Sequence, residues 1–161
     1  MIFLLDVNVL LAMGYADHVH SERVDRWVSQ LAAEHGRDRM MFATCPITEL
    51  GFVRVSSGKA AYAESVAAAR DDLEDLKTSI GMLLIPDDLP SRHLPIWVRK
   101  SDQTTDGYLL ALAKAHDACL ATLDRFIPGS VFIPEETSGP LMVREPTYAE
   151  LRGRSWGVEL R

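Results

Sequence analysis

The first residues of this 161-residue chain constrain its fold more than any other stretch. Four apolar residues, Ile2–Leu5, run without polar alternation into Asp6, and Asn8 follows before a second apolar run. A short apolar run of this kind is typical of a strand buried on both faces of a parallel sheet. Asp6 then lies at the carboxyl end of that strand, where open α/β sheets bind their ligands. An Asx turn or a helix N-cap explains Asp6 and Asn8 equally well, so these residues alone leave both interpretations open.

The length and composition predict one domain with a full hydrophobic core, since 47% of the residues are hydrophobic. No apolar run approaches the ~20 residues of a membrane span, and the N-terminus lacks a basic leader and a small-residue cleavage site. Cys45 and Cys119 have apolar neighbours and are predicted to be buried free thiols in a reducing cytosol, because no Cys/His spacing suits zinc. We therefore expect a cytoplasmic protein without membrane association.

The formal net charge is −6, which does not favour a protein that coats nucleic acid nonspecifically. The charge balance leaves room for a local acidic metal site on an otherwise ordinary surface.

Strand-like and helix-like segments alternate along the chain. Strands are predicted over residues 2–5, 40–43, 82–85, 119–122 and 131–133, with 82–85 buried like the first. Helices are predicted over residues 9–15, 20–34, 47–55, 60–77 and 104–116, with a short helical stretch at 90–98 and a loop at 100–103. Such alternation indicates an α/β fold in which helices flank a central parallel sheet of four to five strands. We expect a single three-layer domain with its core at 2–133 and a less ordered tail at 134–161.

Four carboxylates follow strand ends or open helices in this scheme. Asp6 follows the first strand, Glu49 falls in the first turn of the helix after the second, Asp106 opens the helix at 104–116, and Asp124 follows the fourth strand. In a parallel sheet the strand carboxyl ends and the following helix N-termini share one edge. The four side chains are therefore expected to converge there.

A cluster of carboxylates needs a counter-charge. Two like charges about 4 Å apart repel by roughly 4 kcal/mol at an effective dielectric near 20. Oxygen-only ligands select hard ions such as Mg²⁺ or Mn²⁺, which can polarise a phosphoryl group and activate water. Each acid taken singly is explained as a helix cap or dipole partner, worth about 0.3–1 kcal/mol. The four in one topological place favour a metal site.

These residues also carry a family resemblance. The order of Asp6-Val-Asn8, Thr48-Glu49, Thr105-Asp106-Gly-Tyr-Leu-Leu-Ala-Leu-Ala and Leu120-Ala-Thr122-Leu-Asp124 resembles PIN-domain nucleases, and most closely the VapC-type toxins of bacterial toxin–antitoxin pairs. The resemblance spans about residues 2 to 133. It implies a PIN-like sandwich and a Mg²⁺- or Mn²⁺-dependent endoribonuclease.

The resemblance also implies roles for particular residues. Asp6, Glu49, Asp106 and Asp124 would form the catalytic acidic site, with the three aspartates as metal ligands. Asn8 would orient Asp6 or a water on the metal, and Thr122 would support Asp124. The implied partners are an RNA substrate of the tRNA or rRNA class, a cognate antitoxin protein and a second copy of the chain in a homodimer.

One departure from the family concerns a fifth carboxylate. Many relatives carry another acidic residue just after the arginine that follows the last aspartate, whereas this chain continues Asp124-Arg125-Phe126. A second metal ion is therefore in doubt. Asp102, four residues before Asp106, could substitute if both lie on one helix face, but an N-cap role is favoured for it.

The RNA-binding residues are not identified by the sequence. RNA binding gains from neutralised phosphates, so a basic group should border the site. Candidates are Arg125 and two groups of basic residues, namely Arg92, Arg99 and Lys100 before Asp106, and Arg144, Arg152 and Arg154 in the tail. Trp97 and Trp156 could stack bases, although packing in the core or a dimer is favoured for them.

Two other function classes compete with the nuclease. The first is a catalytically inactive PIN-like module that only binds RNA or protein, but such a module would not need all four acids. The second is a phosphatase of the haloacid-dehalogenase type or a receiver domain. The former needs a second aspartate where this chain has Asn8, and both need a lysine near the site, which the strand assignment does not supply.

Overall fold

The computed structural model describes residues 1–58, 62–63 and 65–135. Residues 136–161 of the predicted tail, with Arg144, Arg152, Arg154 and Trp156, lie outside the described residues.

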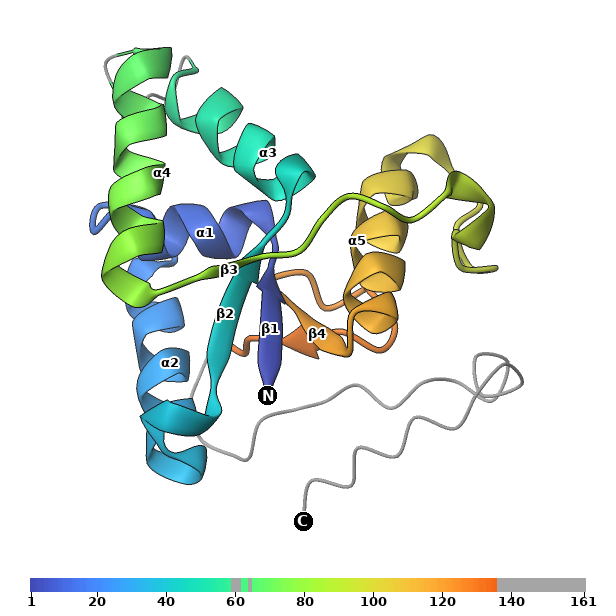
Figure 1. Cartoon of the computed structure of the whole chain (residues 1–161), viewed down its shortest axis with the longest axis horizontal. Coiled ribbons are helices and arrows are strands. Elements are labelled where there is room, and N and C mark those ends of the chain that lie inside the picture. The colour runs from blue at the N-terminus through green and yellow to red at the C-terminus, as the bar shows by residue number, and fades with distance from the viewer. Residues whose placement is uncertain (59–61, 64, 136–161) are drawn as a thin grey trace.

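The chain opens with the central strand of a five-stranded sheet in the order β3-β2-β1-β4-β5 (Figure 1). The strands are β1 (Ile2–Leu5), β2 (Met41–Thr44), β3 (Leu83–Leu84), β4 (Ala118–Thr122) and β5 (Val131–Phe132). Every neighbouring pair is parallel, so all five carboxyl ends lie at one edge. The predicted parallel α/β sheet is thus confirmed.

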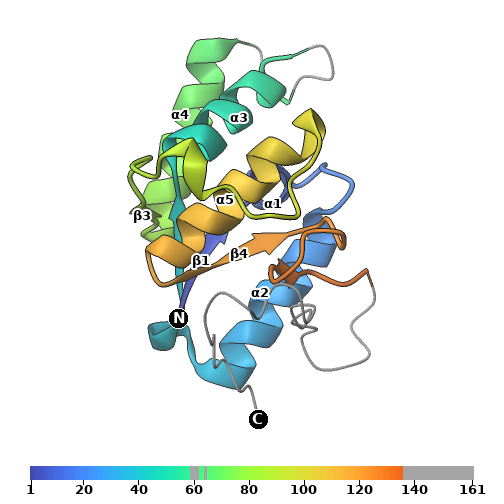
Figure 2. The same ribbon diagram turned by 90° about the vertical axis from the view of Figure 1, so that its right-hand side faces the viewer.

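Helices cover both faces of the sheet and complete the predicted three layers. The helices are α1 (Val7–Gly14), α2 (Ser21–His35), α3 (Pro46–Ser56), α4 (Val66–Ile80) and α5 (Thr104–Ala115), with single 3-10 turns at Arg37–Arg39, Ser91–His93 and Ser101–Gln103. The two views show α5 on one face of the sheet and α1 and α2 on the other (Figures 1 and 2). Helix α3 packs against α1 and α4.

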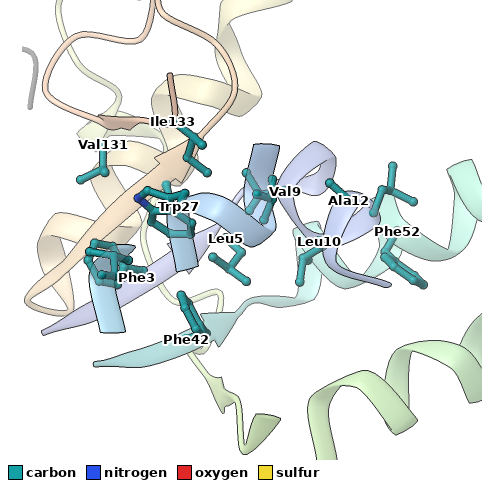
Figure 3. Close-up of a cluster of buried hydrophobic side chains, with 14 of the residues drawn as sticks. Phe3, Leu5, Val9, Leu10, Ala12, Trp27, Phe42, Phe52, Val131 and Ile133 are labelled. Atoms are coloured by element: carbon teal, nitrogen blue, oxygen red, sulfur yellow. The ribbon is translucent and has the colours of Figure 1, made fainter. Parts of the chain in front are cut away.

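The pleat of β1 divides the core into two parts. Phe3 and Leu5 belong to the cluster that contains Trp27 of α2 and Phe52 of α3 (Figure 3), which we call the α2-side core. Leu4 belongs instead to the α5-side core, together with buried residues of α5 such as Leu109 and Leu112. Successive residues of a strand point to opposite faces of the sheet. The two clusters therefore indicate which face each residue at the carboxyl end of the strand points to.

The structure corrects the prediction that residues 82–85 form a strand buried like the first. Strand β3 is short and lies at the sheet edge, where Leu83 is 37% and Leu84 57% exposed. An apolar run predicts a strand but not its position in the sheet, because strand order is set by long-range packing.

The helix predicted at 60–77 has other bounds in the structure, and residues 60, 61 and 64 of that prediction lie outside the described residues. Helix α4 begins at Val66, where the Ser65 hydroxyl accepts a hydrogen bond from the Ala68 backbone N–H (3.1 Å), and it continues to Ile80. Gly81 ends it in the left-handed conformation with φ of 74°. The alanine-rich stretch favours helix by propensity, but the serine cap fixes where the helix starts.

Smaller differences affect the segment before α5. Within the predicted helical stretch at 90–98 only Ser91–His93 form a 3-10 turn, and the predicted loop at 100–103 contains a 3-10 turn over Ser101–Gln103 that runs directly into α5.

Both cysteines are free, as predicted, but only Cys45 is buried and Cys119 is half-buried. None of the helices in the described part of the chain is both long and apolar enough to span a lipid bilayer.

Candidate active site

Asp6 connects the central strand to the first helix. It caps the N-terminus of α1, with its Oδ1 accepting a hydrogen bond from the Val7 backbone N–H (2.6 Å). Its Oδ2 accepts a second hydrogen bond, from the Thr122 hydroxyl (2.9 Å). Burial raises the pKa of the Asp6 carboxyl, and the charge of Asp124 acts in the same direction. The helix-cap interpretation is therefore confirmed, and the same carboxylate also faces the neighbouring strand end.

Thr122 joins two of the predicted site residues. It is the last residue of β4 and is fully buried, and its hydroxyl oxygen, besides donating to Asp6, accepts a hydrogen bond from the Asp124 backbone N–H (3.0 Å). The Asp124 carboxylate in turn accepts a hydrogen bond from the Phe126 backbone N–H (2.8 Å). One buried hydroxyl therefore fixes the carboxylate of Asp6 and the backbone of Asp124 relative to each other.

Asp106 reaches the same edge from α5. It lies in the first turn of that helix and is half-buried. Burial is the largest cause that raises the pKa of Asp106 to about 6, followed by the negative charges of Asp6, Asp124 and Asp102. The structure thus brings the three predicted aspartates within electrostatic range of one another, and it adds Asp102.

Asp102 does not have the predicted N-cap role. The N-cap of α5 is Gln103, and the exposed Asp102 lies in the 3-10 turn that precedes it. Because this turn continues into α5, Asp102 and Asp106 are four residues apart along nearly continuous helical backbone, and the charge of Asp102 acts on Asp106.

Glu49 has different partners from the aspartates. It lies in the first turn of α3, where its Oε1 accepts a hydrogen bond from the Thr44 hydroxyl (2.6 Å) and forms an ion pair with the Lys77 Nζ of α4 (2.8 Å). Lys77 also pairs with Glu74 at 3.0 Å. Glu49 is not among the groups that shift the pKa of Asp6 or Asp106.

The pleat of the sheet explains this separation. Leu4 pairs with Ala43, so the next residue of β2, Thr44, lies beside Leu5 on the side of the α2-side core. Asp6 follows Leu5 and continues the alternation on the side of the α5-side core. Glu49 therefore bonds to a threonine whose side chain is on the other face of the sheet from the one expected for the Asp6 side chain.

The remaining predicted residues lie at or near the surface. Asn8, the second residue of α1, is exposed and makes no side-chain hydrogen bond within the part of the chain that the structure describes. Arg92, Arg99 and Lys100 are exposed. Trp97 is half-buried and packs against the α5-side core, in keeping with the packing role favoured for it.

The donor atoms at this edge suit a hard divalent cation. The three aspartates offer only carboxylate oxygens, and every charge that shifts the pKa of Asp106 is negative. Mg²⁺ and Mn²⁺ prefer such ligands and would offset the repulsion between them. Among the described residues, however, no three acidic, histidine or cysteine side chains are close enough to form a ready-made metal cage. The residues therefore fit an ion by charge and donor type, and side-chain movements would be needed to bring them around it.

Sequence reasoning missed the partners of Glu49. The pairing of Glu49 with Lys77 depends on how α4 packs against α3, which the spacing of residues within either helix does not reveal. The exposure of Phe126, two residues after Asp124, is likewise not given by the sequence pattern.

A parallel α/β sandwich with aspartates at the carboxyl ends of β1 and β4 and at the start of α5 is a PIN-like domain. The chain matches no model of a known protein family. It is 35% identical over 133 residues to ribonuclease VapC39 of Mycobacterium tuberculosis, covering 79% of this chain and 91% of that protein. It is 39% identical over 127 residues to ribonuclease VapC29 of the same organism, covering 77% and 86%. The chain therefore belongs to the VapC ribonuclease family.

A solved structure agrees at the level of the fold. The crystal structure of VapBC2 from Rickettsia felis, bound to a DNA fragment from its promoter, contains a chain that aligns with a TM-score of 0.51 at 15% identity. The alignment covers 77% of this chain and 88% of that one. The family resemblance stated from the sequence motifs is thus confirmed by relatives over most of the chain.

Proposed function

We propose that this protein is a metal-dependent endoribonuclease that acts as the toxin of a type II toxin–antitoxin system. Membership of the VapC ribonuclease family supports cleavage of RNA. The observation that carries the proposal is the environment of the Asp106 carboxyl, where burial and then the negative charges of Asp6, Asp124 and Asp102 raise its pKa to about 6. A structural protein has no evident need to keep the half-buried Asp6 and Asp106 within electrostatic range of each other and of the exposed Asp124 without a counter-charge.

In this proposal Asp6, Asp106 and Asp124 hold Mg²⁺ or Mn²⁺. When bound, such an ion polarises a phosphoryl oxygen and lowers the pKa of a coordinated water. Thr122 fixes the Asp6 carboxylate through its hydroxyl and the Asp124 backbone through its oxygen, so that both ligands keep their orientation. Asp106 would hold the cation as an ionised carboxylate, the form that a bound cation favours. Asn8 extends from the same first turn of α1 and is assigned to orient Asp6 or the attacking water.

Glu49 remains the fourth acid of the proposed site, acting from the α3 side. Thr44 and Lys77 hold its carboxylate in place, which supports a positioning or proton-accepting role rather than direct metal binding. Replacing Glu49 with Gln separates these roles. A loss of cleavage without a loss of metal affinity supports the assignment, and a loss of metal affinity makes Glu49 a ligand.

The family resemblance further supports an antitoxin partner, a homodimer and a cytoplasmic location. VapBC2, with which this chain shares its fold, was solved bound to promoter DNA. We expect the cognate antitoxin of this chain to block the acidic site.

The test is cleavage of RNA by the purified protein. Pools of tRNA and rRNA are incubated with the protein in Mg²⁺ or Mn²⁺, with and without EDTA, and the new ends are mapped. Asp6→Asn and Asp106→Asn are expected to lower the rate at least about 100-fold, the usual order for loss of one electrostatic group at a reacting centre. Asp71→Asn, on the exposed face of α4, is the matched control and should cleave like wild type.

Calorimetric titration with Mn²⁺ distinguishes the nuclease from an inactive binding module. Wild type should bind the ion with an affinity that falls in Asp6→Asn but not in Asp71→Asn. Cleavage that persists in EDTA, or in both site variants, would contradict the proposal.

A further inference from the structure

The segment after β4 holds an exposed aromatic ring beside the acidic site. Phe126 is 69% exposed although it is a large apolar side chain, and it stands two residues after Asp124. Exposed apolar residues are common on protein surfaces when scattered singly. Phe126 differs from such scattered residues because its backbone is hydrogen-bonded to Asp124, a proposed metal ligand.

The backbone on both sides of the ring is anchored. The Phe126 backbone N–H donates to the Asp124 Oδ1 at 2.8 Å, which ties the ring to the carboxylate through one tight turn. The next residue, Ile127, is 2% exposed and belongs to the α5-side core. The carbonyl of Ile127 accepts a hydrogen bond from the Ser130 hydroxyl (2.8 Å). The backbone that carries the ring is therefore anchored to Asp124 and to the core, and the ring itself is exposed.

Arg125 adds a flat cation to the ring. The Arg125 guanidinium carbon lies 4.9 Å from the centroid of the Phe126 ring, within the range of a cation–π interaction. Aromatic rings and guanidinium planes are the groups on which proteins stack the bases of single-stranded nucleic acid, and the cation also attracts phosphate. Asp124, Arg125 and Phe126 thus present a carboxylate, a cation and an apolar plane in three consecutive residues.

Other exposed apolar side chains lack this connection. Leu50 on α3 and Leu84 on the edge strand are 71% and 57% exposed, and Ile96 is 79% exposed. None of these three is hydrogen-bonded to an aspartate of the site in the described structure, and none is aromatic. They offer apolar area, whereas Phe126 offers a stacking plane at the site itself.

We propose that Phe126, together with Arg125, stacks the base of the nucleotide next to the phosphate at the acidic site, and so selects unpaired RNA. This inference rests on the proposed nuclease function and names its substrate class. A base within a duplex is already stacked on both faces, so only a nucleotide in a single strand, a loop or a bulge can place its base on this ring. Phe126 is a substrate-positioning residue, and the aspartates retain the chemistry.

The experiment compares Phe126→Ala, Phe126→Trp and the control Leu84→Ala on a short single-stranded RNA and on the same sequence in a duplex. Removing the ring should raise the KM for the single strand about 5- to 150-fold, the range that corresponds to one base stacked on an aromatic side chain. The kcat should change much less, because the aspartates are untouched. Phe126→Trp should restore the KM, and Leu84→Ala should match wild type.

Binding without cleavage gives an independent readout. The Phe126→Trp variant is titrated with the single-stranded RNA in EDTA, and its fluorescence is compared with that of wild type, which carries the other three tryptophans. Additional quenching in the variant supports stacking on this position. No additional quenching, with binding of equal strength in Phe126→Ala, overturns the inference.

The outcomes separate the inference from the proposed function. Wild type that cleaves RNA with an unchanged KM in Phe126→Ala overturns the stacking role and leaves the nuclease intact. Wild type that cleaves no RNA contradicts the nuclease, and the quenching titration then still decides whether the ring binds bases. An altered oligomeric state of Phe126→Ala on size exclusion, with unchanged RNA affinity, makes the ring a protein contact and overturns the inference. Because the ring is exposed, Phe126→Ala is expected to have the same midpoint of urea unfolding as wild type. Measuring this midpoint checks that the variant is folded.

Discussion

Replacing Asp106 with asparagine is expected to stabilise the metal-free protein at neutral and alkaline pH. The half-buried carboxyl lies within range of three other aspartates, and its pKa is raised from 3.8 to about 6. A carboxyl with a raised pKa in the folded state binds its proton more tightly there than in the unfolded chain. The contribution of Asp106 to the free energy of unfolding is therefore most favourable below pH 4, and it falls as the pH rises from about 4 to about 6.

The size of the effect follows from the two pKa values. The difference between 3.8 and about 6, at about 1.4 kcal/mol per pH unit, gives about 3 kcal/mol above pH 6. Asparagine has the same shape without the charge, so Asp106→Asn should gain up to about 3 kcal/mol at pH 8 and about half of that at pH 5. Contact of the carboxylate with solvent makes these figures upper bounds.

Urea unfolding followed by circular dichroism measures this gain. Wild type, Asp106→Asn and the exposed control Asp71→Asn are unfolded in EDTA at pH 8 and at pH 5. The control should stay within about 0.5 kcal/mol of wild type at both values, as surface substitutions usually do. Added Mn²⁺ should stabilise wild type at pH 8 and act much less on Asp106→Asn, because an ion that binds only the folded state stabilises it by mass action. A variant that is no more stable than wild type at pH 8 would refute the reasoning.

Three further changes test individual contacts. Thr122→Val keeps the shape of the side chain but removes both hydrogen bonds of a fully buried hydroxyl, one of them to a carboxylate. The variant should lose roughly 2–4 kcal/mol of stability in urea unfolding and should cleave RNA more slowly. Unchanged stability and cleavage would contradict the bridging role. Gly107→Ala places a Cβ against the Val98 side chain and should cost about 1–3 kcal/mol, with recovery in the double variant that also carries Val98→Ala. Lys77→Met removes the ion pair of Glu49 and should lower stability by roughly 1–2 kcal/mol; cleavage that is lost beyond what this destabilisation explains would show that the pair positions Glu49 for the reaction.

The sequence predicted the parts of the fold that depend on local pattern. The buried strand at Ile2–Leu5, the alternation of strands and helices, and the position of Asp6 at a strand end all follow from periodicity and short-range chemistry. The edge position of β3 could not be predicted, because strand order depends on contacts between distant segments. The start of α4 at Val66 was missed because it is set by one capping hydroxyl, that of Ser65.

The candidate site shows the same division. Topology alone brings Asp6, Asp106 and Asp124 to one edge, so their proximity could be predicted without coordinates. The side of the edge to which Glu49 turns depends on the pleat at Thr44 and on a lysine from another helix, and neither is visible in the spacing of acidic residues. The sequence therefore predicts which residues lie at the same sheet edge, but not which hydrogen-bond and ion-pair partners each of them has.

The central position of β1 has a consequence for synthesis of the protein on the ribosome. Ile2 pairs with Ala118, and the Asp6 carboxylate is bound by a hydroxyl 116 residues further along the chain. Contacts between residues so distant in sequence form late, because the loop that connects them must first be closed. A nascent chain that ends before β4 lacks Thr122 and Asp124, so its opening strand has one edge unpaired and its aspartate site is incomplete. Under the proposed function, a nascent chain that lacks these residues would not yet cleave RNA.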